Sequence, residues 1–451
     1  MSSASVPRFQ QRLNQAAAAA HDLLRPSRVD RWEVFAKASS FRATRLEAGG
    51  GCITLGEETG VAVRSFRKGL AGFAAASGLE AGAARRAVEG ALSGELPSDR
   101  DPLPPARLLG SVPVPAGDPP APEEWPESVV AELESALTEC AQDRVRLVAA
   151  TAHQGQFAWV LTTAEGFVAG HTGTTCYLLV EAVAKDPEAG VWREWVHVRN
   201  PASFEPRRLA ASLTDRMLLA GPGVDPTAGV QDLLLHREVA AHLLAAMAPL
   251  FLATPPENDH LPALLDRKGL LAAPMVSVVD DRIGRFGPLS GPCDGEGIPS
   301  ESILVLDRGA PRHRIASFRD AMACGDPALG GAARHSYRDY PATGFTNLLL
   351  RCEEGEPPHH LLSEIDRAVY LVRPTAQVEI DLVSGTLRLV ASGVSLDGGR
   401  IQGWHPVVEV RTGLGSFLRG IEMIGNDLQW FQARNGCVGA PSLLVRQQPV
   451  S

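Results

Sequence analysis

The sequence predicts an α+β protein of two domains: an N-terminal α/β domain with an antiparallel sheet, and a β-rich C-terminal domain. Its 451 residues exceed the roughly 250–300 residues over which a single hydrophobic core grows. The 44 glycines and 34 prolines favour many tight turns between short strands. A stretch rich in Gly and Pro at residues 221–229 marks the boundary, so we place the domains at residues 1–220 and 221–451.

In the first half, apolar residues at helical spacing predict a helix over residues 8–38. Alternating apolar and polar residues at 41–73 then predict an antiparallel meander of short strands. Residues 94–126 contain ten of the 34 prolines, so we expect a long connection there without a helix or a central strand. A helix over 127–144, strands up to residue 198 and a helix over 206–219 complete the predicted N-terminal domain.

Beyond the boundary, the sequence predicts one clear helix, over residues 231–252. The remainder is rich in β-branched residues and turn residues, which favours strands. The predicted strands are residues 302–306, 345–350, 376–381, 386–392 and 400–410.

Charge and composition exclude several classes of function. The chain has 43 basic and 52 acidic residues, a net charge of −9 and no basic block, so we expect no nucleic-acid partner. The most apolar stretch, residues 239–253, is shorter than the roughly 20 residues that cross a membrane, so we expect no membrane partner. No apolar signal segment precedes the N-terminal Ala run, and seven scattered cysteines form no CxxC pair. These features predict a cytoplasmic protein with reduced thiols.

Two sets of residues suggest a phosphate-binding or a calcium-binding loop, but their spacing does not match the known motifs. The Gly runs at 49–51 and 393–399 match neither phosphate-loop pattern. The acidic residues at 280–281 and 294–296 lack the ligand order of a calcium loop, and we predict that they lie in surface turns. No GxSxG segment occurs, so the local signature of a serine hydrolase is missing.

The segment richest in chemical groups is residues 233–243, LLLHREVAAHL. On a helix, Glu238 and His242 lie on one face, whereas His236 is about 120° away from His242 around the axis. The zinc motif HExxH requires two His residues four positions apart with Glu beside the first, and this spacing is absent. By spacing alone, a half-buried helix with a Glu–His hydrogen bond is favoured over a zinc site.

Several further motifs occur in a fixed order along the chain. In the second half they are 278–281 (VVDD), 293–299 (CDGEGIP), 302–309 (SILVLDRG), 345–347 (FTN) followed by Gly355, 393–401 (GVSLDGGRI) and 422–427 (EMIGND). This ordered set resembles the TldD/PmbA family of modulators, which is related to zinc peptidases. In the first half, residues 64–74 (RSFRKGLAGFA) are similar to the family's N-terminal strand pair. The resemblance extends over residues 30–445, and no single motif carries it.

This resemblance implies a barrel-like C-terminal domain and a heteromeric complex. In the family, two subunit types pair around an enclosed chamber and cleave unfolded or unstructured peptides, including precursors of peptide natural products. One type, TldD, carries HExxxH on a helix and a distant Cys as the third zinc ligand. The other type, PmbA or TldE, has an incomplete motif.

When the family motif is carried over, its Glu falls on Glu238, its second His on His242 and its late Cys on Cys437, but its first His falls on Arg237. An arginine is permanently protonated and has no lone pair for a metal, so one of the few protein ligands that zinc needs is lost. A π-bulge or a helix start would have to turn His236, one residue upstream, by about 100° into that place.

The leading hypothesis is a non-catalytic subunit of the PmbA/TldE type in a heteromeric zinc metallopeptidase that degrades or processes unstructured peptides. It predicts no zinc in this chain and zinc in a TldD-type HExxxH partner. The first alternative is a self-sufficient peptidase that binds zinc through His236, His242 and Cys437 and uses Glu238 as the general base. The second alternative is a peptide-binding maturation accessory protein without proteolysis.

Overall fold

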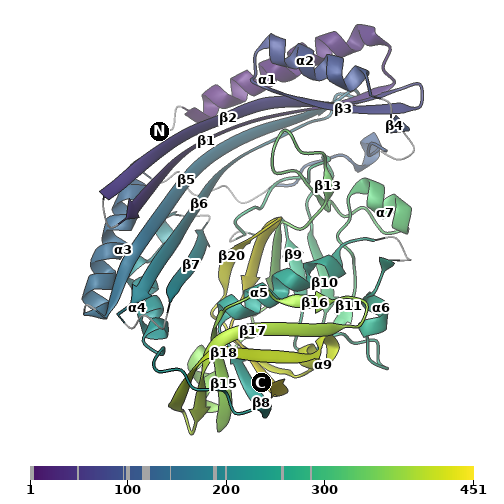
Figure 1. Ribbon diagram of the computed structural model, residues 1–451. Helices are drawn as coiled ribbons and strands as arrows, with labels where there is room; N and C mark the ends of the chain where they lie inside the picture. The colour runs from purple at the N-terminus through teal and green to yellow at the C-terminus, as the bar shows by residue number, and fades with distance from the viewer. Residues whose placement is uncertain are drawn as a thin grey trace.

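A long, curved sheet from the N-terminal half arches over a C-terminal part in which two further sheets pack around one central helix (Figure 1). The computed structural model describes residues 5–47, 50–94, 96–97, 102–113, 122–142, 144–185, 190–198, 201–254, 258–284 and 287–451.

The N-terminal sheet is antiparallel throughout, in the order β4-β3-β2-β1-β5-β6-β7. Four of its strands run for 17 to 19 residues, well beyond the usual length of roughly 3–10, so the sheet reaches across the C-terminal part (Figure 1). The predicted antiparallel meander is confirmed, although its strands are longer than expected. The strands are β1 (Arg31–Glu47), β2 (Gly50–Arg67), β3 (Leu70–Ser77), β4 (Leu96–Pro97), β5 (Val145–Thr163), β6 (Val168–Ala184) and β7 (Val191–Val198).

Two pairs of helices cover one face of this sheet. Val34 and Val160 pack against α1 (Ser5–Leu24) and α2 (Ala81–Leu92). Further along the strands, apolar residues such as Leu178 pack against α3 (Trp125–Ala141) and α4 (Pro206–Met217). Because side chains alternate across a strand, the residues between them, such as Phe35 and Trp159, face the C-terminal part.

The C-terminal part contains a closed barrel and a second sheet. Strands β15, β8, β22, β18 and β17 form a ring that closes because β17 pairs with β15, while β16 and β19 extend it. The second sheet has the order β11-β10-β9-β14-β21-β20. One hydrophobic core joins both to helix α5 (Arg237–Met247). This arrangement confirms the predicted α+β fold and its barrel-like C-terminal domain, while the boundary between residues 220 and 221 stays a prediction.

The C-terminal elements have the following bounds. The strands are β8 (Gly229–Leu235), β9 (Val278–Asp281), β10 (Ser302–Asp307), β11 (Ala310–Pro311), β12 (Ala332–Ala333), β13 (Ala342–Thr343), β14 (Asn347–Leu350), β15 (Arg367–Pro374), β16 (Glu379–Asp381), β17 (Thr386–Asp397), β18 (Arg400–Gly413), β19 (Ile421–Ile424), β20 (Gln429–Ala433), β21 (Gly436–Ala440) and β22 (Leu443–Val450). The helices besides α5 are α6 (Leu261–Leu264), α7 (Phe318–Cys324), α8 (Pro358–Ser363) and α9 (Leu414–Arg419).

The helix predicted over residues 8–38 is wrong in its second half. Helix α1 ends at Leu24, and strand β1 begins at Arg31. Pro26 lies in a 3-10 turn, and Arg28 adopts a left-handed conformation with a φ of 54°. Such a backbone conformation ends a helix, because the next residue can no longer continue the hydrogen-bonding pattern.

The helix predicted over residues 231–252 is also corrected. Its first part is strand β8, its middle is α5, and its end is a 3-10 turn at Ala248–Phe251. The apolar residues at the end of β8 suit a central strand, because β15 and β22 pair with β8 on its two sides. None of the described helices combines the length and the apolar character that a membrane crossing requires.

The Pro-rich connection at 94–126 falls partly outside the described residues, at 95, 98–101 and 114–121. Its described part contains only β4 and a 3-10 turn at Ala106–Leu108 before α3 begins at Trp125. The Gly110 N–H donates to the Gly297 carbonyl at 3.0 Å, and the Val112 N–H to the Pro292 carbonyl at 2.9 Å. The connection therefore crosses from the N-terminal sheet to a loop of the C-terminal part.

Candidate functional site at the start of helix α5

Helix α5 begins directly at the end of a buried barrel strand. His236 is the N-cap residue, in an extended conformation, and its Nδ1 accepts a hydrogen bond of 3.2 Å from the Glu238 N–H. Its own N–H donates to the Leu371 carbonyl of β15 at 2.9 Å. The side chain is buried, and burial together with the positive charges of Arg216 and Arg237 keeps the pKa of His236 well below its usual value.

This cap uses the lone pair that a metal would need. A neutral imidazole has one protonated nitrogen and one acceptor nitrogen. Because Nδ1 of His236 accepts the Glu238 N–H, the proton must lie on Nε2. Neither ring nitrogen then offers a free lone pair, so the helix start does not turn His236 into a replacement ligand.

Glu238 is held by an arginine that no sequence motif indicated. Nη1 of Arg216, at the end of α4, lies 3.0 Å from Oε2 of Glu238, and Nη2 contacts Oε2 of Glu194 on β7. All three side chains are nearly or fully buried, and we call Glu194, Arg216 and Glu238 the α5 cluster. Burial raises the pKa of Glu238 to about 7, against the opposing charge of Arg216.

Arg237 occupies the first position of α5 and is partly buried. Burial lowers the pKa of its guanidinium, while the carboxylates of Glu194 and Asp427 act in the opposite direction. Arginine keeps its proton in proteins and has no acceptor atom. The position that the resemblance assigns to the first zinc ligand is therefore held by a cation.

His242 lies one helical turn beyond Glu238, and its side chain is exposed. It lines a cavity of about 690 Å³ between one face of α5 and the turn that joins β20 to β21. Phe345, Gln432 and Asn435 line the same cavity. His242 is thus the only member of the predicted metal set that we find open to a cavity.

Cys437 contacts an imidazole that is not a member of the predicted metal set. Its Sγ lies 3.6 Å from Nδ1 of His197 on β7, and the same Nδ1 lies 3.1 Å from Oε1 of Gln432. Burial raises the pKa of the Cys437 thiol to about 12 and lowers the pKa of His197 to about 4. At neutral pH both groups are uncharged, so this is a neutral contact between the two halves of the chain.

The side chains predicted as zinc ligands are not gathered at one point. In the part of the chain that the structure describes, no three His, Cys, Asp or Glu side chains gather as metal ligands would. His236 caps the helix, Glu238 binds Arg216, and Cys437 contacts His197. Zinc in proteins normally takes three or four His, Cys, Asp or Glu ligands. Of the predicted ligands, His242 alone makes no such contact with another described side chain or backbone group.

Sequence reasoning missed Glu194, Arg216 and His197. Arg216 is 22 residues away from both of its acidic partners, and His197 is 240 residues away from Cys437. No local spacing can reveal such contacts. The one available signal was the predicted strand at 191–198, where alternation places Trp195 and His197 on the same face.

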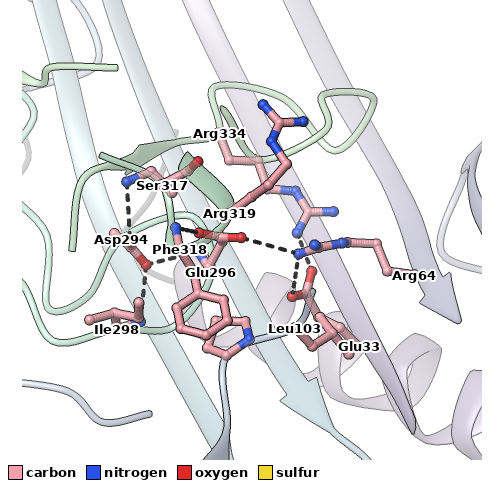
Figure 2. Close-up of polar contacts among 12 residues, drawn as sticks. Glu33, Arg64, Leu103, Asp294, Glu296, Ile298, Ser317, Phe318, Arg319 and Arg334 are labelled. Carbon is pink, nitrogen blue, oxygen red and sulfur yellow. Dashed lines mark hydrogen bonds and ion pairs between the residues drawn. The ribbon is translucent and has the colours of Figure 1, made fainter. Parts of the chain in front are cut away.

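A second buried charge cluster joins the two halves of the molecule (Figure 2). Nη1 of Arg334 lies 2.6 Å from Oε1 of Glu33, and Nη1 of Arg64 lies 3.4 Å from Oε2 of Glu33 and 3.6 Å from Oε1 of Glu296. Glu33 and Arg64 come from β1 and β2, whereas the other two come from C-terminal loops. We call these four residues the interdomain cluster.

The acidic loop beside this cluster is buried, which contradicts the predicted surface turn. Oδ1 of Asp294 accepts from the Glu296 and Ile298 N–H groups at 2.9 and 3.0 Å, and Oδ2 accepts from the Ala332 N–H at 3.0 Å. Asp280 is also buried, where its Oδ1 accepts from the Asn347 N–H at 2.8 Å. These carboxylates hold loops together, a role that turn-like spacing does not distinguish from a solvated turn.

A cavity of about 270 Å³ lies between the N-terminal sheet and the C-terminal loops. Phe157, Trp159 and Lys37 line it from the sheet, and Arg334 and His335 line it from the C-terminal side. The Lys37 ammonium donates to the His335 carbonyl, and burial lowers the pKa of Lys37. The inner face of the sheet therefore offers aromatic surface and a cation to the space between the two halves.

Comparisons with known proteins agree with this architecture. Residues 228–451, about half of the chain and all of α5 and the barrel, match the family described as the PmbA/TldA metallopeptidase C-terminal domain. The chain belongs to the PmbA/TldD family. A comparison with curated proteins found no match.

Three solved structures share the fold over nearly the whole chain. TldE from Thermococcus kodakarensis has a TM-score of 0.82 at 14% identity, over 96% of this chain and 100% of that one. A proposed modulator of a DNA gyrase from Thermotoga maritima MSB8 has a TM-score of 0.78 at 19% identity, over 97% and 100%. A proposed modulator of DNA gyrase from Bacteroides thetaiotaomicron VPI-5482 has a TM-score of 0.79 at 12% identity, over 98% of each chain. At such identities these three matches show the fold alone.

Proposed function

We propose that this chain is the non-catalytic, PmbA/TldE-type subunit of a heteromeric zinc metallopeptidase that degrades or processes unstructured peptides. The observation that carries the proposal is the state of the motif position: Arg237 stands where a ligand is required, and His236 caps α5 through its Nδ1. The zinc would belong to a TldD-type HExxxH partner, where it would polarise the scissile carbonyl and activate water.

In this proposal the chain supplies walls and peptide contacts for a shared chamber. The cavity beside α5 brings His242, Phe345 and Gln432 together, and the cavity under the N-terminal sheet presents Phe157 and Trp159. Both combine apolar side chains with a few polar groups, which is the usual lining of a binding site. Extended peptides of varied sequence could bind by backbone pairing with a strand edge.

Peptide cleavage by each chain alone and by the mixture tests the proposal. This chain would be co-expressed with a TldD-type HExxxH protein from the same organism and assayed on a flexible peptide. We expect cleavage by the mixture only, and we expect a zinc chelator to stop it. Replacing the motif Glu of the partner by Gln should abolish cleavage, whereas Glu238→Gln in this chain should preserve it.

Two outcomes would contradict the proposal. If this chain, purified alone, digests the peptide and chelation stops the reaction, it is a peptidase in its own right. If the two chains form a stable complex that cleaves no flexible peptide, or if no complex forms, the accessory function without proteolysis is favoured instead.

A further inference from the structure

One end of the C-terminal barrel opens into a pocket of about 370 Å³, which we call the barrel mouth. It lies where β8, β15 and β18 begin and where β17 ends. Gln231 lines it from β8, Arg367 from β15, Ser395 from β17 and His405 from β18. The mouths of β-barrels are common places for binding sites, so the polar groups of this pocket were searched for a chemical arrangement.

A serine and a histidine form a hydrogen-bonded pair in the barrel mouth. Oγ of Ser395 lies 2.5 Å from Nε2 of His405, and Nδ1 of His405 lies 2.8 Å from the carbonyl oxygen of Val224. Because a carbonyl oxygen can only accept, Nδ1 carries the ring proton, and Nε2 of the neutral imidazole is an acceptor. The Ser395 hydroxyl therefore donates to His405, which is the arrangement of a nucleophile and its general base.

The chain around His405 fixes the orientation of its ring. The Val224 N–H donates to the Trp404 carbonyl of β18 at 2.9 Å, which places the Val224 carbonyl beside the imidazole. A Cβ atom at Gly403 would lie 2.9 Å from Cγ2 of Val224, so a glycine at this position lets the two segments approach. His405 is only 3% exposed. A carbonyl acceptor on Nδ1 thus does here what a carboxylate does in a catalytic triad.

Ser395 is the member of the pair that a ligand can reach. It pairs directly with Val369, a residue of the barrel core, so its side chain points to the inner side of the ring of strands. It is half-buried and lines the barrel mouth. A GxSxG segment exposes its serine at a strained turn, whereas here the open end of the barrel exposes a serine within a strand.

Strand β18 has a bulge beside this pair. Ser395 pairs with Gly403 and Leu396 pairs with Ile401, so the register leaves Gln402 as an extra residue. A bulge commonly re-aims a side chain next to an active site. The exposed Gln402 also lines the barrel mouth.

We propose that Ser395 and His405 are a nucleophile and general base that hydrolyse small polar esters. Oγ of Ser395 forms a bond to the ester carbonyl carbon while Nε2 of His405 takes the hydroxyl proton. The bond from that carbon to the alcohol oxygen then breaks, and the alcohol leaves with the proton from Nε2. Water attacks the acyl-serine in the same way, which releases the carboxylic acid and restores both residues.

The size and lining of the barrel mouth set the substrate class. Its volume lies near the lower end of the roughly 300–1,000 Å³ of ligand pockets, so the acyl group must be small. The guanidinium of Arg367 and the side-chain amide of Gln402 are hydrogen-bond donors in the same pocket. Such donors stabilise the negative charge that develops on an ester carbonyl oxygen. This inference does not depend on the proposed function, because neither α5 nor zinc takes part in it.

Labelling with a fluorophosphonate tests the proposal, because this reagent reacts with serines that a base activates. The full chain would be labelled, digested and mapped by mass spectrometry. We expect label on Ser395 of the folded protein and none after unfolding in urea. Ser384 is the internal control, since its hydroxyl donates to Asp381 in an exposed turn, and it should stay unlabelled. An unlabelled Ser395 in the folded chain, or equal labelling of both serines, would overturn the proposal.

The release of nitrophenol from p-nitrophenyl acetate gives a second measurement. We expect a burst close to one equivalent per chain, as an acyl-enzyme produces. Ser395→Ala should abolish the burst, and His405→Gln should slow it by about 10²–10⁴-fold, the usual contribution of a general base. Ser384→Ala and a zinc chelator should leave it unchanged, which separates this reaction from peptide cleavage by a zinc subunit.

The serine variant keeps the test decisive if His405→Gln does not fold. Ser395→Ala removes one hydrogen bond and leaves His405 bound to Val224, and thermal unfolding would verify that it is folded. A burst that survives in folded Ser395→Ala would place the reaction at another residue and overturn the proposal.

Discussion

The α5 cluster and the interdomain cluster are both buried networks of carboxylates and guanidinium groups, and each includes a glutamate from a family motif, Glu238 in the first and Glu296 in the second. In the loop beside the interdomain cluster, Asp294 and Glu296 use their oxygens to hold backbone N–H groups and Arg64. In the α5 cluster, the carboxylate that a catalytic subunit would keep for water is bound to Arg216. In both clusters, therefore, a carboxylate from a family motif binds groups of the chain itself: Glu296 binds the Phe318 N–H and Arg64, and Glu238 binds Arg216.

Removal of Arg216 should have the largest effect on stability. Arg216→Leu leaves Glu194 and Glu238 buried without their shared cation, and breaking a buried pair costs roughly 3–5 kcal/mol. Chemical denaturation would measure the loss in the free energy of unfolding. The control is Arg367→Leu, because the Arg367–Asp397 pair is exposed on both sides, and such pairs contribute at most about 1 kcal/mol. Similar losses in the two variants would contradict a structural role for the α5 cluster.

A smaller loss is expected beside the interdomain cluster. In Asp294→Asn, the amide oxygen can still accept from Glu296 and Ile298, but the Ala332 N–H loses its acceptor, at a cost of roughly 1–3 kcal/mol. Thermal unfolding and hydrogen exchange at Ala332 would measure this loss. Asp381→Asn is the matched control, because Asp381 makes the same kind of turn contact in an exposed position and should change stability by less than about 0.5 kcal/mol.

The pH dependence of stability should distinguish Glu238 from an ordinary surface carboxylate. Its folded pKa of about 7 lies above the ordinary value of 4.5, so the stability it contributes is present below pH 4.5 and lost as pH rises through 7. Between pH 5 and 8 the Tm of the wild type should therefore fall by about 2–4 °C more than that of Glu238→Gln. Burial lowers the pKa of His236 and His197, so these two groups make the protein less stable as pH falls below 6.5. Both histidines are present in the wild type and in the variant, so the comparison of the two Tm profiles isolates Glu238. Parallel Tm profiles would contradict the raised pKa.

The smallest effect is expected at Cys437, where we predict the rate of thiol alkylation and no change in stability. A buried thiol with a pKa near 12 presents almost no thiolate at pH 8, and the thiolate is the reactive form. In the folded protein, alkylation followed by mass spectrometry should label the exposed Cys52 and Cys140 and spare Cys437. Rapid labelling of Cys437 in the folded chain would show that it is an accessible thiolate, as a free metal ligand would be.

The sequence predicted the fold class and the family better than the contacts of the site. Alternation at 41–73 was sufficient for an antiparallel meander, because a strand with one buried face has a period of two. The helix at 231–252 was placed too early, because a short apolar run such as Leu233–Leu235 fits a helix and a central strand equally well. The arginine at position 237 was visible in the motif, whereas the partners of Glu238 and Cys437 come from distant strands and helices and required the tertiary structure.

Zinc content of the isolated chain tests the central claim most directly. Elemental analysis after purification with added zinc would compare the wild type with His242→Ala, whose exposed side chain can be removed without disturbing the core. The account predicts equal and substoichiometric zinc in both proteins. Close to one zinc per wild-type chain, lost in His242→Ala, would contradict it and would make this subunit a metalloprotein in its own right.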